Sequence, residues 1–216
     1  MKKQNHIFLR YLILLLGLTL MAAGIVFSIK ADLGTSPVSS LPYVAGLISG
    51  MSVGVATILL HLFLVAVQIV LLREKFEPIQ LLQLIVGILF GFLIDGADEV
   101  LSGVTYHTYG EQWLFCAVGI LLVAAGVSLE VLSDAVVLAG EGAIRTLAQV
   151  TNCTFGNMKI AFDVTLVILS VLLGWLFLYQ PAGVGAGTAA AAVFVGLLAK
   201  FFLRSLRPVR ERLNGE

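Results

Sequence analysis

The chain has 216 residues, of which 59% are hydrophobic and only 12% are charged, and its mean hydropathy is +1.04. This composition excludes an ordinary water-soluble domain and is typical of a polytopic membrane protein. The 13 basic and 13 acidic residues balance to a formal net charge of zero, so we expect no nucleic-acid partner and a lipid bilayer as the surroundings.

The first half of the chain predicts three membrane spans and one short segment. Residues 11–29 carry no charge and are long enough to cross about 30 Å of hydrocarbon, so we interpret them as a retained span and not as a cleaved signal peptide. A polar break, KADLGTSPVSSLPY, follows, and residues 37–50 then form a segment too short to cross the bilayer. Spans two and three are expected at residues 53–72 and 81–94.

The second half predicts the same order of segments. Residues 97–112, which contain no Lys or Arg, are expected to form an extracytoplasmic connection. Spans four, five and six are expected at residues 113–132, 156–178 and 188–203. A second polar break, SDAVVLAGEGAIR, precedes a second short segment at residues 141–151, and a basic cytoplasmic tail is expected at residues 207–216.

The basic residues indicate whether the short segments dip into the membrane or cross it. If they dip, the N-terminus, the loop with Arg73 and Lys75, Lys159 and the C-terminal tail are all cytoplasmic, as the positive-inside rule prefers. If both cross, the chain has eight spans and Arg73 and Lys75 lie outside. We therefore predict six transmembrane helices and two re-entrant half-helices, with both termini in the cytoplasm.

The chain also contains an internal repeat. A shift of 102 residues aligns Gly17 with Gly119, the triplet 22–24 with 124–126, Asp32 with Asp134, and Gly54 with Gly156. Because each half holds three spans, the second half must be inserted upside down, which predicts an inverted repeat of residues 1–96 and 113–206. The alternative is a duplication that serves only close packing of helices through small residues.

The first polar break predicts a helix start inside the protein. Ser36 followed by Pro37 is a typical N-cap and N1 pair. The free amides of such a start, together with nearby hydroxyls, favour a carboxylate or another polar group of a substrate; the candidate residues are Thr35, Ser36, Ser39 and Ser40. The alternative is a capped turn at the surface. Asp32 and Asp134 are expected to form the turns that end their spans.

The second polar break predicts the matching helix start. Gly140 and Gly142 are expected to open it as substrate-binding residues, and Glu141 and Arg145 share one helix face. Either these two charges neutralise each other, or Arg145 binds a substrate anion while Glu141 binds a proton or a cation.

His61 and Asp163 are equivalent under the same shift, and each lies about 13 Å into its span, near the midplane. Either His61 is a packing residue, or the pair takes part in proton coupling. The sequence contains no HExxH or GxSxG motif and no zinc-ligand spacing, so we expect no metal, no cofactor and no enzymatic activity.

Three stretches resemble a known family. ADLGTSPVSSLPYV at 31–44, GFLIDGADEVL at 91–101 and GEGAIRTLA at 140–148 are similar to the YczE/YyaS/YitT group of bacterial inner-membrane proteins. The likeness covers residues 10–205. It implies a small integral protein of the bacterial inner (cytoplasmic) membrane and gives no substrate.

The broken helices and the repeat predict a secondary transporter for a small polar or anionic solute, coupled through protonation of His61, Glu141 or Asp163. One alternative is a passive channel or facilitator of the same architecture. Another is a membrane scaffold or regulator that transports nothing. Small-residue faces on the spans also allow a homodimer.

Overall fold

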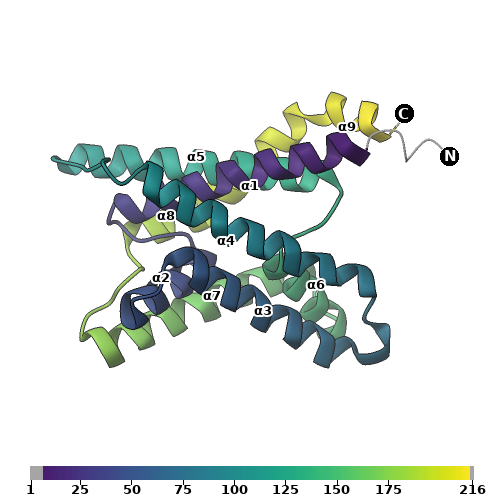
Figure 1. Cartoon of the computed structure of the whole chain (residues 1–216), viewed down its shortest axis with the longest axis horizontal. Helices are drawn as coiled ribbons and strands as arrows, with labels where there is room; N and C mark the ends of the chain where they lie inside the picture. Colours follow the sequence, from purple (N-terminus) through teal and green to yellow (C-terminus); the bar gives the residue numbers. More distant parts are fainter. Residues whose placement is uncertain (1–6, 215–216) are drawn as a thin grey trace.

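The computed structural model describes residues 7–214, and every regular element in that range is a helix (Figure 1). Six helical segments are long and apolar enough to cross a membrane. They are α1 (Ile7–Lys30), α3 (Val53–Leu72) with η2 (Arg73–Lys75), η3 (Pro78–Leu81) with α4 (Leu82–Val100), α5 (Tyr109–Ser133), α7 (Phe155–Leu173) with the π-helical turn η4 (Gly174–Leu178), and α8 (Ala186–Ser205). The all-helical class and the six long apolar helices are therefore confirmed.

Two short helices accompany the long ones. α2 (Pro37–Ser49) and α6 (Ala139–Thr151) have 13 residues each, which is about 20 Å of helix and less than the bilayer core. α6 begins two residues before the predicted start. Figure 1 shows α2 and α6 in opposite halves of the molecule along its long axis.

Two segments predicted as irregular are partly helical. α4 continues through the acidic residues to Val100, and α5 begins at Tyr109. The C-terminal part of α4 stabilises the start of α3, because Asp95 accepts hydrogen bonds there from Gly54 N (2.8 Å) and Ser52 Oγ (2.6 Å). At the C-terminus, residues expected as a basic tail form α9 (Arg207–Asn214), which follows α8 directly.

Arg10 joins three parts of the chain at one end of the molecule. Its buried guanidinium donates to Ser133 O (3.0 Å) at the end of α5 and to Leu213 O (3.3 Å) in α9, and it pairs with Asp134 (3.4 Å). Figure 1 shows both termini and the α3–α4 connection at this end, and the α4–α5 connection at the other.

Two pairs of helices begin at matching positions in the two halves. α2 and α6 start at Pro37 and Ala139, and α3 and α7 at Val53 and Phe155, so each pair is offset by 102 residues. The turns correspond as well: Asp32 and Asp134 both have positive φ values, of 54° and 46°. These correspondences agree with the shift found in the sequence.

α1 and α5 form the central contact of the fold and lie side by side in Figure 1. Glycines make the close approach possible: a Cβ on Gly24 would lie 2.8 Å from Gly119 O, and one on Gly126 would lie 2.5 Å from Gly17 O. Each short helix then packs on a long helix of the other half, α2 on α7 and α6 on α3. The two halves are therefore interlocked.

Candidate functional site

A cavity of about 210 Å³ lies where the starts of α2 and α6 approach each other. Residues 36–39 line it from α2, and Leu138, Gly140 and Glu141 line it from α6. A Cβ on Gly140 would lie 3.9 Å from Val38 Cγ1, so the two helix starts are near neighbours. Helices α1, α3, α4, α5, α7 and α8 complete the wall.

The structure brings together part of the predicted site. The predicted residues that line this cavity are Ser36, Ser39, His61, Gly140, Glu141 and Asp163. Those that do not line it are Thr35, Ser40, Gly142 and Arg145. The sites predicted from the two halves thus converge, but only some of their side chains reach the same space.

At the start of α2, Ser36 has the extended backbone of an N-cap and Pro37 is the first helical residue. The Ser36 side chain does not cap a backbone amide. Its hydroxyl bonds the hydroxyl of Ser39 at 2.8 Å, and both residues line the cavity. The pair offers two hydroxyl groups that can each make further hydrogen bonds to a ligand.

At the start of α6, the equivalent N-cap position is Leu138, which has no polar side chain. The backbone amide of Leu138 itself donates to Glu130 Oε1 of α5 at 2.8 Å, as in the half of a capping box in which a carboxylate accepts from the N-cap amide. The Glu130 side chain is 2% exposed and lines the cavity. A helix start favours a negative charge beside it, while burial of a carboxylate opposes that charge.

Glu130 was missed in the sequence. No sequence signal pointed to it, because its contact with Leu138 N exists only once the turn between α5 and α6 has formed.

Two ion pairs flank the cavity. Lys159 Nζ lies 3.2 Å from Asp163 Oδ2, and both residues line the cavity. Arg145 Nη2 lies 3.9 Å from Glu141 Oε2, but the Arg145 side chain is 58% exposed and does not line the cavity. The sequence predicted only a cytoplasmic position for Lys159. In the structure, Lys159 is the basic residue that lines the cavity.

His61 lines the cavity from α3, opposite in the repeat to Asp163 of α7. It is 4% exposed, and its ring stacks on Phe90 with the centroids 6.1 Å apart and an interplanar angle of 9°. His61 Nδ1 and Asp163 Oδ1 are buried and have no hydrogen-bond partner among residues 7–214. In the same range, no group of three or more His, Cys, Asp and Glu side chains is arranged to hold a metal ion.

Comparison with protein families matches residues 8–204 to a family of unknown function, DUF6198. The chain belongs to the DUF6198 family. No curated protein and no solved structure matches it. The resemblance to the YczE/YyaS/YitT group stays a prediction, and the family assignment brings no substrate with it.

Two predicted residues of this DUF6198 protein serve helix packing. Ser40 Oγ bonds Ser170 Oγ at 2.9 Å and joins α2 to α7. Gly142 occupies the equivalent place on α6, where a Cβ would lie 2.5 Å from Gln83 Oε1 and 2.8 Å from Gln68 Oε1. Gln68 in turn donates to Gln83 Oε1 (3.1 Å) and Ala139 O (3.3 Å). Gly142 therefore makes room for a buried amide pair between α3, α4 and α6.

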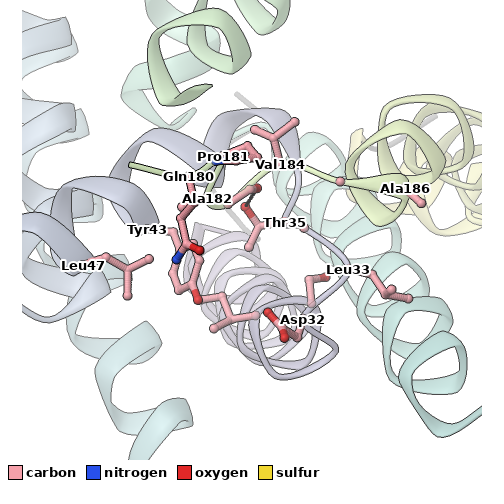
Figure 2. A pocket seen from close by; sticks show the side chains of 15 residues that line it. Asp32, Leu33, Thr35, Tyr43, Leu47, Gln180, Pro181, Ala182, Val184 and Ala186 are labelled. Carbon is pink, nitrogen blue, oxygen red and sulfur yellow. Dashed lines mark hydrogen bonds between the residues drawn. The ribbon is translucent and has the colours of Figure 1, made fainter. Parts of the chain in front are cut away.

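Thr35 faces a second cavity, of about 450 Å³, between the α1–α2 turn and the α7–α8 connection. Figure 2 shows Asp32, Thr35 and Tyr43 gathered near the loop that carries residues 180–182. Thr35 N donates to Gly183 O at 3.0 Å. Burial, and then the nearby Asp32 carboxylate, raise the pKa of the Tyr43 hydroxyl, so this hydroxyl stays protonated at neutral pH.

Consecutive residues of the DUF6198 chain therefore face different cavities, since Thr35 lines the second and Ser36 the first. The backbone at this step, bonded to the α7–α8 loop, stands between them.

Proposed function

We propose that this protein is a secondary transporter for a small solute, with the central cavity as its binding site. The observation that carries the proposal is that the starts of α2 and α6, one from each half of the chain, line a single cavity. Free helix starts are tolerated at membrane depth only where protein or water surrounds them. Broken helices that meet near the midplane are how many secondary transporters bind their substrates.

The proposed architecture is an inverted repeat in which α2 and α6 enter the membrane from opposite faces. Three long helices in each half, matching helix starts and the opposite placement of α2 and α6 support it (Figure 1). Since the termini and the loop with Arg73 and Lys75 lie at one end, we assign that end to the cytoplasm of a bacterial cell.

The proposed coupling groups are the ionisable residues that line the cavity. Glu130 joins His61, Glu141 and Asp163 in this role, because all four lie against the binding space. Arg145 no longer suits the role of substrate anchor, since it is exposed and lies outside the wall.

The proposal is tested by the accessibility of single cysteines in membrane vesicles, in a background with Cys116→Ala and Cys153→Ser. Ser39 lines the cavity, and the neighbouring Ser40 does not, although both are buried. We expect Ser39→Cys to react with a membrane-impermeant thiol reagent applied to either face, because a transporter opens alternately to both. Ser40→Cys, the matched control, should stay unreactive.

The alternatives give different results. A scaffold with a sealed cavity leaves Ser39→Cys unreactive from both faces, and a pocket that opens to one side only allows reaction from that side; either result would refute transport. A channel or facilitator also allows reaction from both faces, but its flux does not respond to a pH or sodium gradient, whereas flux through a coupled transporter does.

A further inference from the structure

The ion pairs of the central cavity leave one acidic group without a direct ion-pair partner. Three carboxylates line the cavity, from Glu130, Glu141 and Asp163, against the single ammonium of Lys159. Lys159 pairs with Asp163, and Arg145 pairs with Glu141 from outside the wall. Within residues 7–214, Glu130 has no ion-pair partner.

The start of α6 favours a negative charge on Glu130, whereas its burial and the neighbouring Glu141 carboxylate oppose that charge, and a cation in the cavity would offset both. Oε1 accepts from Leu138 N at the start of α6, and a helix start favours a negative charge. Oε2 accepts no hydrogen bond from the residues that the structure describes. A cation in the cavity would therefore meet a carboxylate that is already held in place.

The neighbouring aromatic side chains are a second, independent sign of a ligand. His61 is 4% exposed, lines the cavity and makes no hydrogen bond to any described residue. Its ring stacks on Phe90, which also lines the cavity. Aromatic faces attract organic cations, and they do so more strongly away from water.

The rest of the wall separates an organic cation from a metal ion. It is largely aliphatic, with Met21, Ile25, Val123, Val127, Ile144, Val195 and three alanines. Hard metal cations need several oxygen ligands around one point, and among residues 7–214 no three His, Cys, Asp or Glu side chains are arranged in that way. An organic cation can place its charge on Glu130 and its apolar body against the aliphatic side chains.

We infer that the central cavity binds a small organic cation, with the Glu130 carboxylate as its counter-charge and the His61–Phe90 pair beside it. The inference rests on the proposed function, because it names the class of solute that the transporter carries. It replaces the anionic solute expected from the sequence, since the cationic side chain of that hypothesis, Arg145, lies outside the cavity.

The first test measures binding to the purified full-length protein with probes of equal shape and different charge. Choline has a trimethylammonium head and a net positive charge. In 3,3-dimethylbutan-1-ol and 3,3-dimethylbutanoate, a tert-butyl group of the same shape replaces this head, and the molecules are neutral and negatively charged. Tetramethylammonium and guanidinium extend the series of cations. We expect at least one cation to bind about tenfold more tightly than the neutral and anionic probes. Glu130→Gln should weaken that binding about tenfold or more, and Asp98→Asn, an exposed carboxylate paired with Lys30, should not change it. Equal or tighter binding of the neutral or anionic probe, or no binding of any cation, would overturn the inference.

A second test needs no ligand. It compares the rates at which a cationic and an anionic methanethiosulfonate of similar size modify the thiol of Ser39→Cys. Each rate is divided by the rate of the same reagent with a free thiol in solution, which corrects for the intrinsic reactivity of the reagent. We expect a cation preference of about tenfold that Glu130→Gln removes. Equal rates without the Glu130 substitution would contradict the inference even if Glu130→Gln does not fold.

The results can separate the transport proposal from the inferred cation site. If cation binding depends on Glu130 but reagents do not reach Ser39→Cys from both faces, the cation site is supported and the transport proposal is refuted. Access from both faces with a preference for anions would do the reverse.

Discussion

The contact between α1 and α5 gives the sharpest test of the fold. In Gly24→Ala, the new Cβ would lie 2.8 Å from Gly119 O and 2.8 Å from Val123 N. These are backbone atoms, so the clash can be relieved only if the two helices move apart. Overpacking of this kind costs about 1–3 kcal/mol. The control, Gly96→Ala, is in α4, where nothing lies within 4 Å of the new Cβ, and it should gain up to about 1 kcal/mol of helix propensity.

The same propensity gain applies to Gly24→Ala, so the two variants should differ by the packing cost alone, about 1–3 kcal/mol. At roughly 2–4 °C per kcal/mol for a chain of this size, Gly24→Ala should unfold about 2–12 °C below Gly96→Ala. Cys116 is 1% exposed, so in a Cys153→Ser background a fluorogenic maleimide reports unfolding in detergent. A Gly24→Ala protein that unfolds at or above the temperature of Gly96→Ala would show that α1 and α5 do not approach as described.

Two further predictions concern the ends of the helices. Asp95→Ala removes both hydrogen bonds that Asp95 accepts at the start of α3, so it should destabilise the protein by about 1–2 kcal/mol in the same maleimide assay. The control is Asp98→Ala, an exposed partner of Lys30, which should change the free energy of unfolding by less than about 0.5 kcal/mol. Equal effects of the two would refute the capping role of Asp95. Arg10→Met removes the hydrogen bond to Leu213 O and should speed trypsin cleavage of the C-terminal helix about tenfold, which corresponds to about 1.4 kcal/mol of local stability. The control is Arg207→Gln, an exposed partner of Glu211, which should speed cleavage less than twofold. Unchanged cleavage of Arg10→Met would show that other contacts hold α9 in place.

Local sequence signals predicted the helices of this protein well. Long apolar runs gave the six long helices, and the Ser36–Pro37 pair gave the first residue of α2. The second polar break indicated the second short helix but placed its start at residue 141, whereas the helix begins at Ala139, opposite Pro37 under the 102-residue shift. These features depend on composition and on residues adjacent in the chain, which a sequence shows directly.

The wall of the cavity could not be predicted as completely, because it depends on which way each side chain points after many helices have packed. Thr35 and Ser36 are adjacent, yet they face different cavities. Gly142 was predicted as a ligand, but amides from α3 and α4 fill the space beside it. Glu130 lies in the last turn of α5 and reaches the start of α6, a contact that only the turn between them creates.

The difference between the two halves explains where the cavity lies. In the first half, α3 and α4 pack closely because Gly54, Gly87 and Gly91 carry no side chains and Asp95 caps α3. The 102-residue shift places Ala189, Val193 and Leu197 of α8 opposite Gly87, Gly91 and Asp95.

The second half thus lacks both the close glycine contacts and the cap, and α7 and α8 do not pack along each other. Gly54 contacts α4 closely, but no atom lies within 4 Å of a Cβ on Gly156, which is the residue of α7 equivalent to Gly54 under the shift. The cavity extends between these two helices, with Lys159 and Asp163 of α7 on one side and Ala192 and Val195 of α8 on the other. The matching positions of α2 and α6 bring the two short helix starts together, and the absence of close packing between α7 and α8 leaves the cavity beside them.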